Sequence, residues 1–425
     1  MKYQSIRGTK DILPIEALEW QRIEALARDL FAVYGYMEIR TPIIEETGLF
    51  VKSVGEDTDI VKKEMFSFVD RGEREISLRP EGTAPIVRAY LENSLDKTDP
   101  FQKLYYIGPM FRAERPQAGR LRQFHQAGVE AIGSNSPALD AEVITLMARL
   151  LEAIGIKDYV MKLNNLGCRE DKKKLSGLLK ETFSRKETAK LLCDDCKRRA
   201  GANPLRLLDC KSESCRAVVR KHFREIDFLC GDCKANFDEV QKFLKLSGVR
   251  YAIDPFIVRG LDYYTRTVFE AVCDKLGAQN AVGAGGRYDN LISQMGGPET
   301  GACGFALGVD RMLLAISPRT AEVKKNSGWD LLYIAALGEA ARVKGFTILN
   351  DMRSSGIASA MTYEDSSLKS QMRAADKLEA KFVLIIGDDE IKKGEAALRN
   401  METKEQVSIR FDDMVKVIKD KIKRC

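Results

Sequence analysis

The chain is poor in histidine and lacks a long apolar run. Only His125 and His222 occur among its 425 residues, which argues against a metal centre built on several histidines and against a Ser-His-Asp triad. No run reaches the roughly 18 apolar residues of a membrane span. The N-terminal stretch MKYQSIRGTKDILP lacks the apolar core of a secretory signal. We therefore expect a cytoplasmic globular protein with no membrane partner.

Common nucleotide-binding and hydrolase motifs are missing as well. The sequence holds no GxxxxGK(S/T) loop, HExxH or GxSxG. The glycines of Gly283–Gly286 do not fit GxGxxG. The chemistry is therefore expected to rest on carboxylates, arginines and backbone groups.

Charge is nearly balanced over the whole chain but not along it. The net charge is +6, whereas residues 171–236 alone hold 17 Lys and Arg against 10 Asp and Glu, a difference of +7. Seven of the ten cysteines lie between Cys168 and Cys233. The basic segment indicates a local contact with a polyanion. Clustered cysteines in a cytosolic chain indicate metal ligands or buried thiols.

Hydrophobic periodicity predicts an α+β fold in three parts. Helical spacing predicts helices at 15–34 and 136–154. Alternating stretches predict strands at 36–42, 65–70, 75–81, 103–114 and 122–133, and strand patterns resume at 250–254 and 263–272. Strand pairs without βαβ crossovers imply an antiparallel sheet with helices on one side. The predicted parts are a core (1–170 and 237–320), a helical Cys-rich insertion (171–236), and a C-terminal α/β domain (328–425) after a polar linker at 318–328.

The strands at 103–114 and 122–133 carry the most informative faces. Side chains alternate along a strand, so one polar face is predicted to hold Arg112, Glu114, Phe124, Gln126, Gly128 and Glu130. A core strand with one solvated face would explain any one of these strands. Two facing strands beside an Arg-rich loop favour a phosphate-binding site instead, with Gly128 leaving space for a ligand.

Three further segments gather polar side chains. LRPEGTA places Glu81 and Thr83 at a helix start, where the carboxylate either faces the positive helix end or grips an ammonium group. RGLDYYTRTVFE brings Arg259, Tyr263 and Tyr264 together in a β-rich stretch that is hard to bury without a polar ligand or network. GFALGVDRML places Arg311 about one turn into a helix behind two glycines, which suits phosphate approach.

Together these segments resemble the class II aminoacyl-tRNA synthetases, and among them the histidyl-tRNA synthetase family. GYMEIRTPIIEE, FRAERPQAGRLRQFHQAGVE and GFALGVDRML match motifs 1, 2 and 3 of the class, and RGTKDILP matches near the start. LRPEGTA, RGLDYYTRTVFE and GAGGRYDNL are specific to the histidine enzymes. SLKSQMRAADKLEAKFVLIIGDDE resembles the family's anticodon-binding domain.

The resemblance implies an ATP-dependent histidine–tRNA ligase that forms histidyl-adenylate and passes the histidyl group to tRNA. Histidine would be held by Glu81, Thr83, Gln126, Glu130, Tyr263 and Tyr264, with Glu130 and Tyr264 at opposite edges of the imidazole. ATP, with Mg²⁺ on its outer phosphates, would be held by Arg112, Glu114, Phe124, Arg259 and Arg311. Arg112 and Arg259 would be the catalytic clamp on the α-phosphate. Phe124 would stack under adenine, and Arg311 would pair with the γ-phosphate.

The resemblance also implies partners. Loop 115–122 would meet the acceptor end of histidine tRNA through Gln117 and Arg122, and motif 1 would form a homodimer interface. The alternative function is a catalytically inactive, histidine-sensing regulatory subunit of ATP phosphoribosyltransferase. Such relatives tend to lack the anticodon-binding domain and to erode motif 2 and the RGLDYY segment, all of which this chain retains.

The insertion carries two further hypotheses. The pairs Cys193/Cys196 and Cys230/Cys233 resemble a four-thiolate zinc site, with a longer gap than the common spacing. Cys210 and Cys215 lie between them and could compete, and buried thiols are the alternative. The basic residues Lys197, Arg198 and Arg199 are expected to touch the tRNA acceptor stem, or else to form a solvated face.

Overall fold

The computed structural model describes residues 3–210, 212–223, 226–316 and 331–423. Contacts divide the chain into two compact units, Met1–Pro318 and Arg319–Cys425. The linker predicted at 318–328 lies outside the described residues. In the part of the chain that the structure describes, no helix is both long and apolar enough to cross a membrane.

The first unit is built on an eight-stranded sheet. In chain order its strands are β1 (Met37–Glu38), β5 (Gln102–Phe111), β6 (Gln123–Ile132), β7 (Val160–Asn165), β8 (Tyr251–Ile253), β9 (Thr265–Val272), β10 (Ala281–Arg287) and β11 (Ala302–Gly308). Their order in space is β1-β5-β6-β11-β10-β9-β7-β8. Neighbours are antiparallel except for the outer pairs β1–β5 and β7–β8. This sheet confirms the predicted α+β class with an antiparallel core.

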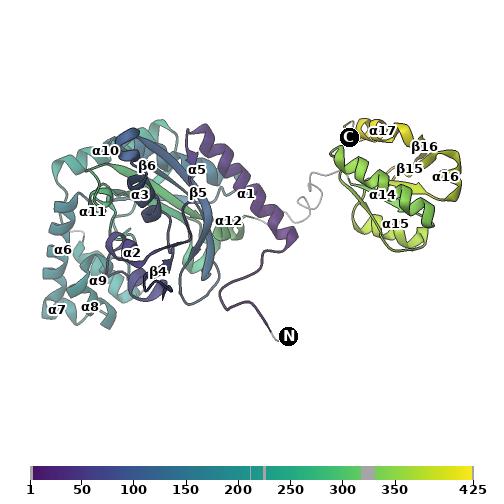
Figure 1. The fold of residues 1–425 in the computed structure, drawn as a ribbon. Helices are drawn as coiled ribbons and strands as arrows, with labels where there is room; N and C mark the ends of the chain where they lie inside the picture. Colours follow the sequence, from purple (N-terminus) through teal and green to yellow (C-terminus); the bar gives the residue numbers. More distant parts are fainter. Residues whose placement is uncertain (1–2, 211, 224–225, 317–330, 424–425) are drawn as a thin grey trace. The chain divides into compact units, whose positions relative to one another are not determined.

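Helices cover one face of this sheet (Figure 1): α1 (Pro14–Val33), α5 (Pro137–Ala153) and α10 (Gly231–Leu246). The predicted helices at 15–34 and 136–154 are confirmed to within one residue at each end. Ala127, Val129 and Ala131 of β6 are buried in the same core as these helices. Because strand side chains alternate, Phe124, Gln126, Gly128 and Glu130 lie on the opposite face. The helices thus leave that face free to build a pocket.

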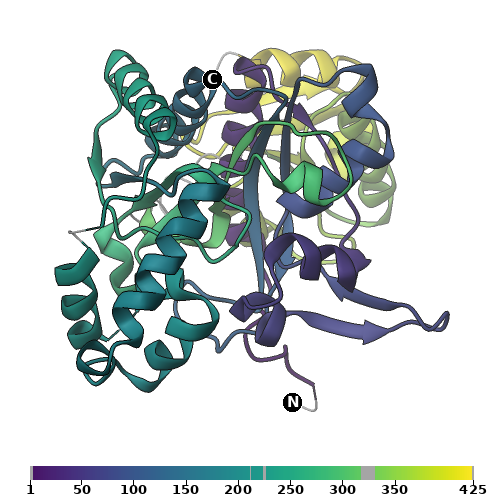
Figure 2. The ribbon, with the colours of Figure 1, turned by 90° about the vertical axis from the view of Figure 1, so that its left-hand side faces the viewer.

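A smaller sheet is formed by β2 (Ile44–Glu46), β3 (Phe66–Val69) and β4 (Glu75–Leu78), in the order β2-β4-β3. In Figure 2 this purple-blue sheet projects away from the rest of the unit. The predicted hairpin of β3 and β4 is confirmed. The strand predicted at 36–42 is shorter than expected, since β1 ends at Glu38. The Arg79 guanidinium donates a hydrogen bond to the Thr41 carbonyl at 3.0 Å, in place of the bond that a neighbouring strand would donate.

Strand β10 is a central strand that the sequence pattern does not predict. Its Gly283–Gly286 stretch offers few side chains from which alternation could be read. The glycines are required by packing, since a Cβ at Gly286 would lie 2.7 Å from the carbonyl oxygen of Thr267 and 2.9 Å from the Tyr264 ring. Such close approach of neighbouring groups is a characteristic use of glycine within a strand.

The insertion forms a helical layer with its own small core. It comprises α6 (Arg169–Ser184), α7 (Lys186–Ala189), α8 (Asp194–Ala202), the 3₁₀ turn η2 (Pro204–Leu207) and α9 (Glu213–Phe223). These helices gather at the lower left of Figure 2. Leu175 and Phe183 of α6 pack with Leu207 and Val219 in a cluster separate from the main core.

The second unit is a five-stranded sheet with the order β13-β12-β14-β15-β16. Its strands are β12 (Leu332–Ala336), β13 (Ser359–Met361), β14 (Phe382–Ile386), β15 (Glu395–Asn400) and β16 (Gln406–Arg410). Its helices are α14 (Glu339–Ser354), α15 (Leu368–Lys377), α16 (Asp388–Lys393) and α17 (Met414–Lys423). The parallel pairs β12–β13 and β12–β14 follow from the predicted alternation of strands and helices. The antiparallel hairpin β15–β16 is not predicted, because β16 buries only Ile409 and shows little hydrophobic alternation.

Candidate active site

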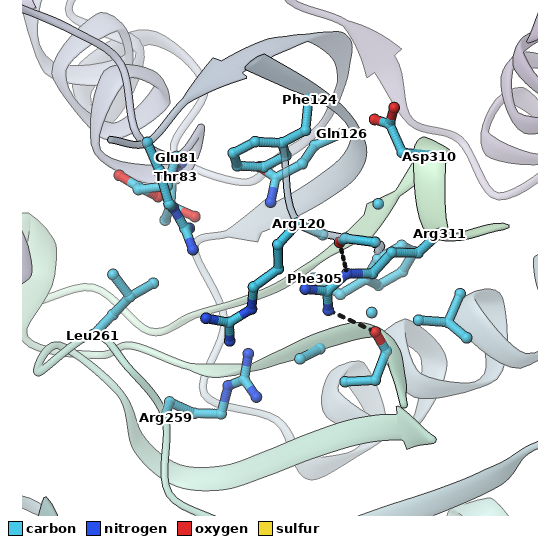
Figure 3. A pocket seen from close by; sticks show the side chains of 18 of the residues that line it. Glu81, Thr83, Arg120, Phe124, Gln126, Arg259, Leu261, Phe305, Asp310 and Arg311 are labelled. Atoms are coloured by element: carbon cyan, nitrogen blue, oxygen red, sulfur yellow. Dashed lines mark hydrogen bonds between the residues drawn. The ribbon is translucent and has the colours of Figure 1, made fainter. Parts of the chain in front are cut away.

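A pocket opens on the sheet face opposite α1 and α5. Residues from the β5–β6 hairpin, the segment before β9, strands β10 and β11, the first turn of α12 (Val309–Ala315) and the start of α3 (Thr83–Glu92) line it (Figure 3). The structure gathers here most of the predicted site residues: Glu81, Thr83, Arg112, Glu114, Phe124, Gln126, Arg259, Tyr263, Tyr264 and Arg311. Glu130, Gln117 and Arg122 do not line it. Arg120, Tyr106, Leu261 and Asp310 line it without having been predicted.

Glu81 lies at one end of the pocket, directly before α3. Its carboxylate accepts hydrogen bonds from the backbone N–H groups of Thr83 at 2.7 Å and Ala84 at 2.9 Å. The Tyr263 hydroxyl lies 3.4 Å from the same carboxylate. Burial raises the pKa of Glu81, and the two backbone donors oppose that rise. The interpretation that Glu81 faces the positive helix end is therefore confirmed, and its grip on an ammonium group stays a prediction.

Glu130 lies behind Thr83, away from the pocket surface. The Thr83 hydroxyl donates to its Oε1 at 2.7 Å, and the Tyr288 hydroxyl donates to its Oε2 at 2.6 Å. Burial is the largest influence on this carboxyl and raises its pKa to about 8. Both carboxylate oxygens of Glu130 thus already accept a hydrogen bond from a neighbouring side chain. Direct contact between Glu130 and a bound imidazole stays a prediction.

Tyrosines support this end of the pocket from behind. Tyr106 packs where Gly82 and Gly128 have no side chain, and a Cβ on Gly128 would lie 2.5 Å from its ring. The Tyr106 ring thus occupies the space at Gly128, and the prediction that a ligand approaches there is wrong. Tyr288 is a further residue that the sequence does not single out. Its only sequence signal is its place in GAGGRYDNL, directly after β10.

Arginines occupy the other end of the pocket. Arg112 donates through Nε to the Pro80 carbonyl at 2.9 Å, and its guanidinium lies 5.4 Å from the centre of the Phe124 ring. Arg259 pairs with Glu270 at 3.1 Å. Arg120 pairs with Glu114 at 2.6 Å. Figure 3 shows Arg120 and Arg259 extending toward each other across the pocket.

Arg311 connects two walls of the pocket. It projects from α12 (Val309–Ala315) and donates to the carbonyls of Gly119 at 2.9 Å and Ala281 at 2.8 Å (Figure 3). Burial is the first cause that lowers its pKa, and the positive charges of Arg120 and Arg112 follow. The positive charges of Arg120 and Arg112 thus lie close enough to the Arg311 guanidinium to repel it. Such a concentration of positive charge favours a polyanionic ligand.

Some polar atoms in the pocket wall have no partner among the described residues. They are Gln126 Oε1, Arg259 Nε and Arg120 Nε, all buried. Buried polar groups are nearly always hydrogen-bonded in native proteins, so unpaired ones indicate a missing ligand or water. The unpaired acceptor, Gln126 Oε1, suits an ammonium donor, and the unpaired arginine donors suit phosphate oxygens.

The predicted tRNA contacts lie on the loop between β5 and β6. Gln117 is exposed and pairs with Arg120 through backbone groups at the loop tip. Arg122 is half-buried, with its backbone N–H bonded to the Gly8 carbonyl at 2.7 Å and its Nε to the Glu114 carbonyl at 3.3 Å. Contact of either residue with tRNA stays a prediction.

The cysteines of the insertion form two clusters instead of the predicted one. Cys193 and Cys196 lie with Cys210 and Cys215. Cys230 and Cys233 lie with Cys168 and Asp171. The predicted zinc set Cys193, Cys196, Cys230 and Cys233 is therefore wrong. The two pairs separate because the second begins α10 beside the start of α6, whereas the first begins α8 within the insertion.

The fold and the pocket define a class of protein. An antiparallel sheet, with helices on one face and an arginine-rich pocket on the other, and a separate α/β unit after it, are the architecture of a class II aminoacyl-tRNA synthetase. The model of the histidyl-tRNA synthetase family matches residues 8–312, and that of an anticodon binding domain matches residues 332–421.

Individual proteins agree with these family matches. A histidine–tRNA ligase of Clostridioides difficile (strain 630) is 45% identical over 417 residues, which cover 98% of this chain and 99% of the relative. The solved structure of apo histidyl-tRNA synthetase of S. aureus has a TM-score of 0.79 at 34% identity and covers 98% of this chain and 99% of that one. The chain therefore belongs to the histidyl-tRNA synthetase family.

One further solved structure bears on the alternative function. It is described as an ATP phosphoribosyltransferase regulatory subunit/histidyl-tRNA synthetase from Bacillus halodurans C, with a TM-score of 0.66 and coverage of 91% of this chain and 99% of that one. Its 22% identity supports a shared fold alone. The regulatory function is thus less supported than that of the ligases matched over full length.

Proposed function

We propose that this pocket activates L-histidine with ATP and transfers it to histidine tRNA. As a member of the histidyl-tRNA synthetase family, the chain is an aminoacyl-tRNA ligase. The observation that supports the pocket assignment is that one cavity has two chemically different ends. One end holds buried acceptors at Glu81 and Gln126, and the other holds the guanidiniums of Arg112, Arg259 and Arg311. Histidine would fill the first end and the ATP phosphates the second.

Glu81 and Gln126 are proposed to hold the α-ammonium group of histidine. The unpaired Gln126 Oε1 would accept one of its protons, and Glu81 would balance its charge. Tyr264, which lines the pocket, would donate or accept at one edge of the imidazole. Thr83, Glu130 and Tyr288 form the hydrogen-bonded chain at the other edge. A site built to pair with the polar groups of its substrate rejects analogues that lack them, by on the order of 10⁴-fold.

Arg112 and Arg259 are proposed to clamp the α-phosphate. A histidine carboxylate oxygen would attack the α-phosphorus in line, and the bond to the pyrophosphate oxygen would break, which leaves histidyl-adenylate and pyrophosphate. Negative charge grows on the oxygens around the α-phosphorus during this step, and fixed guanidiniums would stabilise it. The Nε of Arg259, buried without a partner among the described residues, would be a donor to that charge. Phe124 would stack on adenine with Glu114 nearby, and Arg311 would take the γ-phosphate.

Mg²⁺ is proposed to enter bound to the outer phosphates of ATP. Glu81, Glu114 and Asp310 are the carboxylates that line the pocket. Each already accepts from the protein: Glu81 from backbone N–H groups, Glu114 from Arg120 and Asp310 from the His125 N–H at 2.9 Å. The donor set suits an ion carried mainly by phosphate oxygens, which is how Mg²⁺ is commonly held at nucleotide sites.

In the second step, the 3′-terminal ribose hydroxyl of histidine tRNA would attack the acyl carbon of the adenylate and release AMP. Gln117, Arg122 and the rest of loop 115–122 are proposed to receive the acceptor end. The C-terminal unit is proposed to contact the anticodon, in keeping with its match to an anticodon binding domain. A cytoplasmic location remains a prediction.

A homodimer is proposed through the segment from β1 to β3. Met37, Ile44, Phe68 and Val69 are apolar side chains with exposed fractions of 63%, 51%, 48% and 63%. Large exposed apolar side chains in neighbouring elements are typical of protein–protein contacts. A second copy of the chain would cover them.

The test is histidine-dependent ATP–pyrophosphate exchange. Exchange is expected with histidine alone among the amino acids, and Arg259→Ala is expected to slow it by about 10²–10³-fold, the cost of losing one donor to a developing charge. Arg149→Ala is the matched control, since Arg149 lies on α5 and contacts Glu152 and the Ser247 carbonyl. No exchange from folded wild-type protein would contradict the proposal and favour the histidine-sensing function.

A further inference from the structure

We propose that Cys193, Cys196, Cys210 and Cys215 bind one zinc ion as a four-thiolate site in the insertion. The cysteines come from the start of α8, the turn after η2 and the first turns of α9. None of them lines the proposed active site. The zinc site is therefore a structural proposal that stands or falls independently of the proposed reaction.

The distances among the sulfurs fit a tetrahedral metal. All four Sγ atoms lie within 4.8 Å of one another, and the Sγ atoms of Cys193 and Cys210 are 3.9 Å apart. A tetrahedron with Zn–S bonds of about 2.3 Å has edges of about 3.8 Å. A disulfide would need about 2.05 Å, and all four cysteines are free. The cluster therefore has the spacing of metal ligands.

Backbone donors already point at these sulfurs. The Cys193 N–H donates to Cys215 Sγ at 2.9 Å, and the Ser212 N–H donates to Cys210 Sγ at 3.4 Å. Donors of this kind stabilise thiolates, the form that binds zinc.

Binding is an exchange of protons for the metal. Four thiols and Zn²⁺ give a four-thiolate complex of net charge −2 and four protons released to solvent. No oxidant or reductant is needed. The surrounding insertion is basic, with a net charge of +7 over residues 171–236 from 17 Lys and Arg against 10 Asp and Glu. Lys197 and Arg198 follow the first ligands on α8. Their charge opposes that of the complex.

The insertion also has a structural need for a cross-link. Its separate core is small and is formed by α6 and several shorter helices, with Leu175, Phe183 and Val219 among its buried residues. Small cores of this kind often require a metal or disulfides for stability. A zinc ion would tie α8, the turn after η2 and α9 together at one point.

The second cluster is explained without a metal. Asp171 accepts from the backbone N–H of Cys230 at 3.0 Å and from that of Cys168 at 3.4 Å. Cys230 precedes α10 as its N-cap, and Cys168 precedes α6 in the same way. Asp171 thus serves two helix starts with its two carboxylate oxygens, which is capping. Cys230 and Cys233 provide matched control positions.

The test is the metal content of full-length protein prepared without chelators, with parallel variants. Wild type and Cys230→Ser/Cys233→Ser are each expected to hold about one zinc per chain, and Cys196→Ser/Cys215→Ser about none. Cys193→His is expected to keep the zinc, because three cysteines and a histidine also bind it. After exchange with Co²⁺, wild type should show thiolate-to-cobalt absorption, and Cys193→His should shift it.

The Cys193→His variant and the cobalt spectrum do not depend on whether the double variant folds. Zinc-free folded wild type would overturn the proposal, as would one iron per chain in place of zinc. Two zinc ions, one lost with each double variant, would support this site and overturn the capping role of the second cluster. Metal content is read without activity, so its failure leaves the proposed aminoacylation untouched.

Discussion

The hydroxyl of Tyr288 donates a 2.6 Å hydrogen bond to Oε2 of Glu130, and both side chains are almost fully buried. The Thr83 hydroxyl fills the other carboxylate oxygen. Three elements, the α3 start, β6 and the turn after β10, are thereby joined behind the proposed histidine pocket. Tyr288 is thus a positioning residue for the specificity end of the site.

Tyr288→Phe is expected to raise the KM for histidine by roughly tenfold, because leaving the buried Glu130 carboxyl without this partner costs about 1–3 kcal/mol. The KM for ATP should stay unchanged, since the arginine end is not touched. Pyrophosphate exchange at varied histidine and ATP measures both. Tyr90→Phe is the control, because its hydroxyl bonds the Pro100 carbonyl and does not line the pocket. An equal rise in both KM values would contradict the positioning role.

Glu130 is expected to make stability depend on pH. Its folded pKa of about 8 lies above its ordinary value of 4.5, chiefly through burial. Between these values the native state holds a proton that the unfolded chain releases, so the free energy of unfolding falls as pH rises. The fall is on the order of a few kcal/mol. Glu130→Gln should remove this component. Urea unfolding of both proteins near pH 5 and near pH 9 measures it, and parallel pH profiles would argue against it.

Charge reversal on α8 tests the expected tRNA contact of the insertion. Lys197 and Arg198 are exposed and pair only locally, with Asp194 and Asp195. Lys197→Glu/Arg198→Glu should raise the KM for tRNA several-fold and leave pyrophosphate exchange unchanged. Lys242→Glu/Lys245→Glu on α10 is the control. An unchanged KM for tRNA would place the contact elsewhere.

Arg199 is left out of that variant for a structural reason. It reaches Asp59 at 3.7 Å and the Arg206 carbonyl at 3.4 Å. Reversing its charge would disturb the contact between the insertion and the core. The expected basic surface is therefore narrower than the three consecutive residues of the sequence indicate.

The proposed dimer is tested at Ile44. Ile44→Glu should shift the protein toward monomer, because burial of such a side chain is worth about 1.5–3 kcal/mol and a charge there has no partner. Sedimentation velocity across a concentration series measures the shift. Leu246→Glu is the control, since Leu246 on α10 is 75% exposed and far along the chain from β1 to β3. A variant that dimerises like wild type would rule out this interface.

Periodicity predicts the elements whose faces differ most. The helices α1 and α5 and the hairpin β5–β6 follow from alternation and helical spacing, because each buries one apolar face. Strand β10 does not follow, since glycines carry no pattern. The edge strand β16 does not follow either, because it buries only Ile409.

The residues of the site likewise divide into those that strand alternation predicts and those that it does not. Arg112, Phe124 and Gln126 are predictable because strand alternation puts them on one face. Tyr288 and the two separate cysteine clusters depend on which segments meet in space, which spacing along the chain does not reveal. The prediction that Gly128 leaves space for a ligand is wrong, because the Tyr106 ring from the neighbouring strand fills that space.

Asp171 joins the starts of α6 and α10, so the insertion leaves the core and returns to it within reach of one carboxylate. A segment whose ends meet adds little closure entropy to the fold that carries it. Its length and content are accordingly free to change without moving the catalytic sheet. In engineering terms, this junction is a grafting point, where the basic insertion could be replaced by a short turn or by a different domain.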